Sequence, residues 1–311
     1  MIAVSGLRKA FGSTVVLDGV DLEVAEGTTF ALLGPNGAGK TITVQILSTL
    51  IGFDGGAVRV AGYDLPRDAE NVRRSIGVTG QFSAVDALLT GAENLALMAD
   101  LNHLGRADGR RRVAELLDSF DLTGAAHKAA STYSGGMRRR LDLAMTLVGR
   151  PRLIFLDEPS TGLDPRSRRM MWQTIRDLVA DGVTIFLTTQ YLEEADHLSD
   201  RVAVLDKGRI VAEGTPEELK RRIPGGHVRL RFTDPAGFAT AARAFPDAVR
   251  HEDTLTLQVP SDGSVRSLKR ILDRLDDESV EVGELEVHTP DLDDVFLALT
   301  GHDTTEKVAV A

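Results

Sequence analysis

The sequence predicts an α/β domain built on a parallel sheet, followed by a smaller α+β domain. Largely apolar runs at 153–156 and 183–189 are typical of strands that are buried on both faces of a parallel sheet. A third apolar run, at 28–33, leads through a glycine-rich loop into a segment without helix breakers at 41–47. Beyond residue 226 the pattern changes to alternation of apolar and polar residues, which is typical of half-buried antiparallel strands.

The composition indicates an ordinary globular protein. Of 311 residues, 42% are hydrophobic and 26% charged, and no apolar run approaches the length of a membrane-spanning helix. The first residues do not form a signal-peptide pattern, and without cysteine there are neither disulfides nor thiolate metal ligands, which suits a cytosolic protein. A net charge of -10 weighs against nucleic acid as a partner and against an anionic lipid surface. If the protein works at a membrane, we expect it to reach the membrane through a protein partner.

The first domain is predicted to contain strands interrupted by a helical insertion. In addition to the runs above, strands are expected at 15–25, 58–62 and 75–79, and an edge hairpin at 202–205 and 209–212. From about residue 82 to residue 150 the segments rich in Ala, Leu, Glu and Arg predict helices instead. A further helix is expected at 166–180.

Pro224-Gly225-Gly226 is the best candidate for a linker, and we place the domain boundary between residues 223 and 224. The second domain, 224–311, is expected to have strands at 228–232, 254–259 and 280–287 and helices at 264–275 and 292–299. Residues 303–311 are expected to form a loose tail. The second domain contains no chemical motif.

The strongest local signal is the G-x-x-x-x-G-K-[ST] pattern between a predicted strand and a predicted helix. It comprises Gly34, Pro35, Asn36, Gly37, Ala38, Gly39, Lys40 and Thr41. Glycines let backbone N–H groups surround a phosphate, and the helix N-terminus adds partial positive charge. Lys40 can reach the β- and γ-phosphates, and the Thr41 hydroxyl can ligate Mg²⁺. The alternative is a glycine-rich turn that has arisen by chance.

Two carboxylates, Asp157 and Glu158, follow the apolar run at 153–156. The carboxyl end of a parallel strand is where ligands bind in open α/β sheets. Asp157 is placed to hold Mg²⁺, and Glu158 to activate a water molecule. The alternative is that both residues cap the next helix.

Two weaker signals remain open from the residues alone. Ser134 is a good helix N-cap, and the bare N–H groups of Gly135 and Gly136 could bind a second phosphate, although such a sequence is usually only a cap. Phe11 could stack on an adenine ring or could belong to the core.

The order of these motifs resembles the nucleotide-binding subunit of ATP-binding cassette (ABC) transporters, over about residues 2–222. The resemblance rests on the phosphate loop, Gln81, Ser-Gly-Gly-Met at 134–137, Leu-Asp-Glu-Pro at 156–159 and Ser-Thr-Gly-Leu-Asp at 160–164. It implies a P-loop fold with a helical subdomain, and a head-to-tail homodimer that holds two ATP molecules between its subunits.

The resemblance also implies a role for each site residue. Catalysis would use Glu158, Lys40, Gln190, Gln81 and Asp164. ATP would be bound by Phe11, by residues 34–41 and Ile42, and by Ser134, Gly135 and Gly136 of the other protomer. Mg²⁺ would be held by Thr41, Gln81 and Asp157.

The sequence departs from the family pattern in two places. Tyr-Ser-Gly-Gly-Met replaces the usual Leu-Ser-Gly-Gly-Gln, which keeps the donors that face ATP. Gln190 stands where the family usually has a histidine, and a neutral amide can donate a hydrogen bond to phosphate but cannot become cationic. Together with residues 290–301, this variant resembles the daunorubicin-resistance type of drug-exporter ATPase. For residues 290–301 the alternative is a generic amphipathic closing helix.

We therefore expect an ATPase that powers export of a small drug-like or amphipathic compound through a separate integral membrane permease. The subunit would lie at the cytoplasmic face of the cell membrane, held there by its partner. An importer ATPase is the nearer alternative. A non-transport cassette that acts on DNA or ribosomes is disfavoured by the single cassette, the negative charge and the short spacing of about 50 residues between Gln81 and Ser134.

Overall fold

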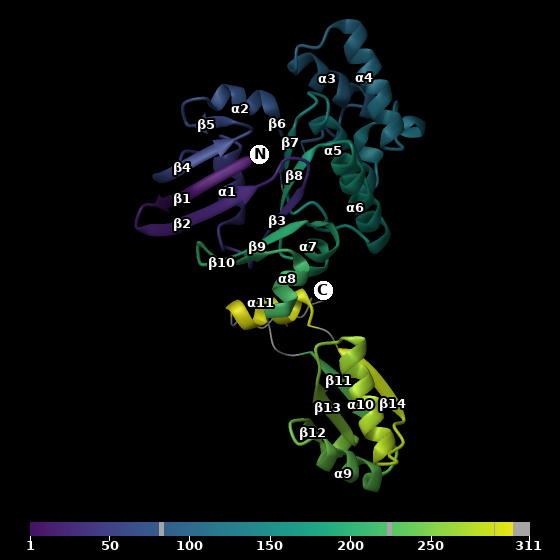
Figure 1. Cartoon of the computed structure of the whole chain (residues 1–311). Coiled ribbons are helices and arrows are strands. Elements are labelled where there is room, and N and C mark those ends of the chain that lie inside the picture. The colour runs from purple at the N-terminus through teal and green to yellow at the C-terminus, as the bar shows by residue number, and fades with distance from the viewer. Residues whose placement is uncertain (81–83, 223–225, 289, 301–311) are drawn as a thin grey trace. The chain divides into compact units, whose positions relative to one another are not determined.

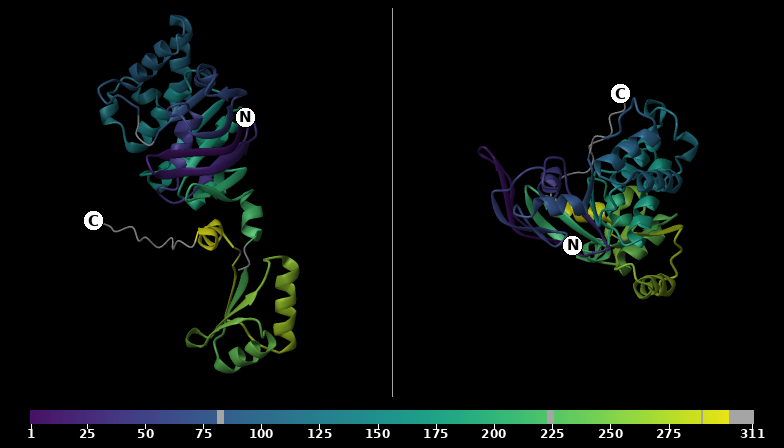
Figure 2. Two further views of the ribbon diagram at one scale, coloured as in Figure 1. Left: turned by 90° about the vertical axis from the view of Figure 1, so that its left-hand side faces the viewer. Right: turned by 90° about the horizontal axis from the view of Figure 1, so that it is seen from above.

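The computed structural model describes residues 1–80, 84–222, 226–288 and 290–300 (Figure 1, with two further views in Figure 2). Gln81, the linker residues Pro224 and Gly225, and the expected tail at 303–311 lie outside these ranges. The chain forms two compact units, Met1–Pro216 and Glu217–Ala311, and each is described separately. In the described part of the chain, no helix combines the length and apolar character that crossing a membrane requires.

The first unit is organised around a six-stranded sheet with the order β10-β9-β3-β8-β7-β6. Its members from β6 to β9 are parallel, and β10 pairs antiparallel with β9 at the edge. The central strands β3, β7 and β8 are buried at every position, as their apolar runs predict. The strands are β3 (Thr29–Leu33), β6 (Ile76–Thr79), β7 (Leu153–Asp157), β8 (Thr184–Thr189), β9 (Arg201–Asp206) and β10 (Arg209–Gly214).

A second, antiparallel sheet has the order β2-β1-β4-β5. One core cluster joins its buried side chains to those of helix α1 (Lys40–Leu47) and to one face of the parallel sheet. Phe186 lies near the middle of this cluster, with its ring 5.6 Å from the rings of Phe30 and Phe155. The strands are β1 (Ile2–Phe11), β2 (Thr14–Val24), β4 (Gly55–Val60) and β5 (Tyr63–Leu65).

Helices cover the other face of the parallel sheet. Figure 1 shows α5, α6 and α7 on the side opposite β1, β2 and β4, and α3 and α4 beyond α5. The predicted helical insertion thus corresponds to α3, α4 and α5 with two short 3-10 turns. The helices of this unit are α2 (Ala69–Ser75), α3 (Gly91–Leu101), α4 (Arg106–Ser119), α5 (Gly135–Thr146), α6 (Pro165–Ala180) and α7 (Leu192–Leu198). Helix α8 (Pro216–Arg222) begins at the last residue of the first unit and otherwise belongs to the second.

The second unit is built on an antiparallel sheet with the order β12-β13-β11-β14. One face packs with α9 and α10 around a core that includes Val228, Leu230, Phe238 and Ile271. This agrees with the predicted α+β class. Its elements are β11 (His227–Arg231), α9 (Pro235–Ala244), β12 (Val249–His251), β13 (Thr256–Pro260), α10 (Val265–Asp277), β14 (Glu284–His288) and α11 (Leu292–Thr300).

The expected strands differ from the structure most clearly in two places. The strand predicted from residue 280 begins only at Glu284, because the Val280 N–H donates to the Leu275 carbonyl and closes helix α10 instead of joining the sheet. Strand β1 was not predicted, although it pairs with both β2 and β4. Its alternation of buried and exposed residues is broken by register shifts after Val4, which hides the period of two.

Candidate active site

The phosphate loop connects β3 to α1, and its glycines are required by close contacts. A side chain on Gly34 would place its Cβ 2.3 Å from the Leu205 carbonyl oxygen. Gly39 has a φ of 112°, and a Cβ there would lie 2.7 Å from a methyl group of Leu17. Gly37 also has a positive φ of 81°. The close contacts therefore require glycine at Gly34 and Gly39, the two fixed glycines of the motif. The positive φ favours glycine at Gly37 as well.

Lys40 is the first residue of α1 and is almost completely buried. Its Nζ donates to the carbonyl oxygens of Gly34 at 2.8 Å and Pro35 at 3.2 Å, and lies 3.6 Å from Glu158 Oε1. Burial lowers the pKa of Lys40, while the charges of Glu158 and Asp157 partly offset the shift. The loop thus holds the ammonium group between its own carbonyls and a carboxylate.

Asp157 ends β7 and is buried beside two hydroxyl groups. Thr188 Oγ1, on the neighbouring strand β8, donates to Asp157 Oδ1 at 2.5 Å. Thr41 Oγ1, in the first turn of α1, lies 3.3 Å from the same oxygen. Carboxylate and hydroxyl oxygens are the ligands that Mg²⁺ prefers, so this pair fits the metal expected from the sequence.

Glu158 has a positive φ of 50°, which is unusual for a residue with a side chain. Its N–H donates to the Thr188 carbonyl at 3.1 Å, and this bond fixes the turn that follows the strand. The turn places the carboxylate at Lys40 on one side and 3.3 Å from the Thr161 hydroxyl on the other. Strained backbone at a strand end is typical of a functional position.

Two other predicted residues of the loop differ in environment. Asn36 is exposed, whereas Ile42 packs against the core cluster of the first unit. The Ile42 side chain therefore contributes to packing against the core.

Ser134 is the N-cap of α5, as predicted, and accepts a hydrogen bond from the Met137 N–H at 3.2 Å. The helix begins directly after it, at Gly135. Gly136 lies against α6, because a Cβ there would be 2.7 Å from Ser167 Oγ. Among the residues the structure describes, no hydrogen bond or ion pair joins Ser134, Gly135 or Gly136 to the phosphate loop.

Asp164 is the N-cap of α6, and its carboxylate accepts hydrogen bonds from the N–H groups of Arg166 and Ser167, both at 2.9 Å. The Ser167 hydroxyl donates to it at 2.6 Å. These bonds, that of the Ser167 hydroxyl first, lower the pKa of Asp164. The sequence reading assigned this residue to an interface and did not foresee the cap.

Gln190 follows β8 directly and is half-buried. The Gly34 N–H donates to the carbonyl of the preceding Thr189 at 3.3 Å, so Gln190 lies beside the start of the phosphate loop. Within the described ranges, the Gln190 side chain has no hydrogen-bond partner. The structure thus places Gln190 near the phosphate loop, with its side-chain amide available to form hydrogen bonds.

Phe11 lies at the tip of the β1–β2 hairpin and is 49% exposed, which excludes the alternative of a core residue. The Lys9 ammonium group lies 5.2 Å from the centre of its ring. Gln81, the remaining predicted residue, lies outside the described residues.

Comparison with known proteins identifies the family. Residues 17–161 match the family model described as ABC transporter, and residues 214–300 match that of the C-terminal domain of DrrA1-3-like ATP-binding proteins. The chain is 47% identical to the daunorubicin resistance ATP-binding protein DrrA2 of Streptomyces coeruleorubidus, over 99% of this chain and 97% of that protein. The chain belongs to the ABC transporter family.

Two further similarities support this assignment. The doxorubicin resistance ATP-binding protein DrrA of Mycobacterium tuberculosis strain H37Rv is 44% identical, over 99% of this chain and 95% of that protein. A solved dimeric ATP-binding cassette, in a post-hydrolysis state with ADP and phosphate, matches with a TM-score of 0.62 and 25% identity, over 69% of this chain and 98% of its own. The predicted ABC fold with a C-terminal domain is confirmed, and the chain is an ABC ATPase that binds nucleotide.

Sequence reasoning missed one residue of this ABC ATPase site, Thr188. It bonds the carboxylate of Asp157 through its hydroxyl and the backbone of Glu158 through its carbonyl. No sequence signal distinguished it, since β8 has threonine at its first position and at both of its last two positions.

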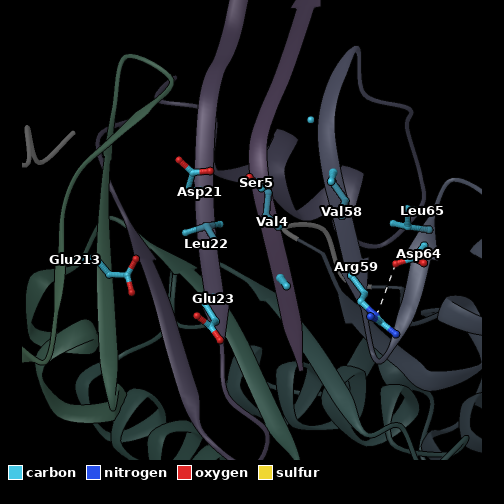
Figure 3. Close-up of a pocket in the computed structure, with 13 residues that line it drawn as sticks. Val4, Ser5, Asp21, Leu22, Glu23, Val58, Arg59, Asp64, Leu65 and Glu213 are labelled. Atoms are coloured by element: carbon cyan, nitrogen blue, oxygen red, sulfur yellow. Dashed lines mark ion pairs between the residues drawn. The ribbon is translucent and has the colours of Figure 1, made fainter.

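A separate hollow of about 800 Å³ lies over the outer face of the antiparallel sheet (Figure 3). Four carboxylates line it, and Arg59 pairs with one of them, Asp64, at 3.7 Å. None of the predicted site residues lines this hollow. Its acidic lining disfavours an anionic nucleotide.

Proposed function

We propose that this ABC ATPase powers export of small amphipathic, drug-like compounds through a separate membrane subunit. The observation that carries the proposal is the 47% identity, over 99% of the chain, to a daunorubicin resistance ATP-binding protein. The similarity includes the C-terminal unit, since residues 214–300 match the C-terminal domain of DrrA1-3-like proteins. Similarity beyond the ATPase core favours this class over the importer ATPases and non-transport cassettes.

ATP would be bound by the phosphate loop and by Phe11. The N–H groups of residues 34–42 would surround the β- and γ-phosphates, and the N-terminus of α1 would add its dipole. Lys40 would exchange a carbonyl partner for a phosphate oxygen while remaining near Glu158. The exposed ring of Phe11 would stack on the adenine.

Thr41 and Asp157 would hold Mg²⁺, with Gln81 as the further ligand that the resemblance implies. Bound there, Mg²⁺ would supply positive charge against the negative charge that develops during phosphoryl transfer. Thr188 keeps Asp157 oriented toward Thr41, because both hydroxyls bond the same carboxylate oxygen.

Hydrolysis would use Glu158 as the general base for the attacking water. The strained turn after β7 directs its carboxylate to Lys40, so a phosphate bound by Lys40 would lie beside the base. Gln190 would donate its amide N–H to a γ-phosphate oxygen from the neighbouring strand end.

A second copy of the chain would complete each site. Ser134 and Gly135 are exposed at the N-terminus of α5, a twelve-residue helix, where they could donate to the γ-phosphate bound by the partner copy together with Gly136. The dimeric cassette with bound ADP and phosphate supports a homodimer of this kind. Asp164 would lie at the same interface.

The membrane partner would be an integral permease subunit, and the ATPase would be held by it at the cytoplasmic face of the cell membrane. We place the ATPase domain at residues 1–223, with its helical insertion at about 82–150, and an accessory domain at 224–311. Closure and reopening of the ATPase dimer would bias a permease that has two conformations.

The test uses inside-out vesicles that contain the chain together with its permease, with fluorescent daunorubicin as the probe. We expect accumulation of daunorubicin that requires ATP and Mg²⁺. Vesicles with Glu158→Gln serve as the control, because the same proteins are present without the base. Vesicles that hydrolyse ATP at the wild-type rate but accumulate no daunorubicin would contradict this proposal.

A further inference from the structure

Helix α5 carries a buried ion pair that the proposed reaction does not use. Arg139 and Asp142 lie one turn apart, with Arg139 Nη1 3.2 Å from Asp142 Oδ2. Their side chains are 12% and 4% exposed. Desolvation of a buried ion pair costs free energy, which further hydrogen bonds of the two side chains must offset. The partners of these further bonds therefore show which segments the pair holds together.

The remaining bonds of Arg139 go to two segments that flank the predicted catalytic residues. Its Nε donates to the Pro159 carbonyl at 3.0 Å, and Pro159 directly follows Glu158. Its Nη1 donates to the Gly80 carbonyl at 3.1 Å, and Gly80 directly follows β6. One guanidinium group therefore links α5 to the ends of β7 and β6.

Asp142 extends this link. Its Oδ1 accepts a hydrogen bond from the Ala84 N–H at 3.1 Å, so the pair holds backbone on both sides of residues 81–83. The helix itself is fixed against β6, where the Thr146 hydroxyl bonds that of Thr79 at 2.9 Å. A Cβ on Gly77 would lie 2.4 Å from the Thr146 methyl group, so this strand and α5 are in close contact.

The charge environment also connects the pair to the active site. Burial lowers the pKa of Arg139, and the charge of Asp142 is the largest of the effects that oppose this shift. The charges of Glu194 and Asp157 act in the same direction as Asp142. The guanidinium group therefore lies within the field of the carboxylate proposed to hold the metal.

Arg140, the next residue on α5, provides a comparison. Its Nη1 donates to the Phe120 carbonyl at 2.7 Å, and it pairs with the exposed Asp121 at 3.3 Å. It thus makes the same kinds of bond as Arg139, but its partners lie at the end of α4 and not at the ends of β6 and β7.

We propose that Arg139 and Asp142 are positioning residues for ATP hydrolysis, which hold the backbone at Pro159, Gly80 and Ala84 in register with the N-terminus of α5. Ser134 caps the same helix, and the nucleotide bound by the partner protomer would contact that helix end. The pair would then transmit this contact through α5 to Glu158 of its own chain. This inference rests on the proposed dimeric ATPase mechanism.

The test compares purified Arg139→Gln, Arg139→Lys and Asp142→Asn with Arg140→Gln as the matched control and with Glu158→Gln as the reference. Steady-state hydrolysis, ATP affinity at equilibrium and urea unfolding are measured for each protein. We expect kcat to fall about 10- to 100-fold in Arg139→Gln, the scale of a small displacement of catalytic groups, with ATP affinity unchanged. Arg139→Lys should recover part of kcat, because an ammonium group can still donate to one carbonyl. Arg140→Gln should lower stability at most and keep kcat.

A second measurement follows ATP-induced dimer formation in the Glu158→Gln background. Adding Arg139→Gln should leave the dimer intact, since the Ser134 end of α5 is not altered. A kcat for Arg139→Gln equal to that of Arg140→Gln, or loss of ATP affinity or of the dimer in parallel with kcat, would overturn the inference. If Glu158→Gln itself hydrolyses ATP normally, the proposed mechanism fails instead, so the two failures are distinguishable.

Discussion

The hydroxyl of Thr188 donates to the carboxylate of Asp157 across the register of two neighbouring parallel strands. The same carboxylate oxygen also faces Thr41, which is 116 residues away in the sequence. Thr188 therefore determines the direction in which the proposed metal ligand points, although it is not itself a predicted ligand. Removal of a partner of a metal ligand typically lowers metal affinity or activity by about 10- to 100-fold.

The first prediction concerns Thr188→Val, which keeps the shape of the side chain and removes its hydroxyl. The Mg²⁺ concentration for half-maximal hydrolysis should rise by about 10-fold or more, because Asp157 loses its orienting bond. The control is Thr184→Val on the same strand, where the hydroxyl accepts a bond from the Gly27 N–H at the opposite end. Equal Mg²⁺ dependence in the two variants would contradict the role of Thr188.

The second prediction concerns Glu158→Gln, which keeps hydrogen bonding and removes the base. Hydrolysis should slow by at least ~100-fold, within the range for loss of a general base, while ATP still binds through Lys40 and the loop. Single-turnover hydrolysis checks the loss of rate, and an equilibrium titration with ATP checks that binding is retained. Glu70→Gln, at an exposed ion pair with Arg74, is the control. Near-normal turnover in Glu158→Gln would show that another group activates the water.

The parts of the site that could be predicted from sequence are those whose residues lie within one short segment of the chain. The phosphate loop and the two carboxylates at the end of β7 depend on local strand, turn and helix chemistry, and the structure places Lys40 beside Glu158 as a consequence. Thr188 and the Arg139–Asp142 pair could not be predicted, because their roles depend on sheet register and on which helix covers which strand end.

A different reason applies to Asp164, where the sequence did contain the missing information. An aspartate followed by proline and two polar residues is a helix-start signal, with proline at the first helical position. The resemblance to the ABC family implies an interface role for Asp164, whereas this local pattern indicates the helix cap. Strand β1 illustrates the opposite limit, since its register shifts remove the alternation that identifies a strand.

The third prediction separates the two roles of Asp164. Asp164→Asn should keep the cap, since asparagine is as good an N-cap as aspartate, whereas Asp164→Ala should lose it and lower the urea midpoint. If the cap is the main role, Asp164→Asn retains turnover and Asp164→Ala loses both stability and turnover. If the charge acts at the dimer interface, Asp164→Asn loses turnover with an unchanged urea midpoint. Steady-state hydrolysis and urea unfolding of the three proteins distinguish these cases.

The fourth prediction concerns Gln190, whose amide has no partner within the described residues and lies beside the phosphate loop. Gln190→Ala should lose turnover by ~10-fold or more, the scale of a lost donor to a charged group at roughly 1.5–3 kcal/mol. Gln190→His should keep substantial activity, because an imidazole can make the same bond and Glu158 already supplies the base. Hydrolysis is measured with the permease present, across a range of about pH 6 to pH 8.5 that spans the ordinary histidine pKa. An alanine variant as fast as the wild type would mean that Gln190 only packs.

The last prediction concerns Glu194, on α7, which is completely buried and accepts a hydrogen bond from the Trp172 indole N–H at 3.2 Å. Burial raises the pKa of Glu194, and the hydrogen bond from the Trp172 indole offsets part of the shift. A carboxyl group with a raised pKa in the folded state keeps its proton over a pH range in which the unfolded chain has already lost it. Its contribution to stability is therefore fully present below the ordinary carboxyl pKa and is lost as the pH rises through the raised value.

Glu194→Gln removes this dependence, because an amide does not ionise and can still accept from Trp172. The urea midpoint of the wild type should fall relative to that of Glu194→Gln between about pH 5 and about pH 8, a range above the ordinary carboxyl pKa. Glu193→Gln, at the exposed neighbour that pairs with Arg168 at 3.7 Å, should change with pH as the wild type does. Parallel midpoints for the wild type and Glu194→Gln over this range would show that Glu194 is ionised in the folded protein, with its charge balanced by the neighbouring donors and by Arg168.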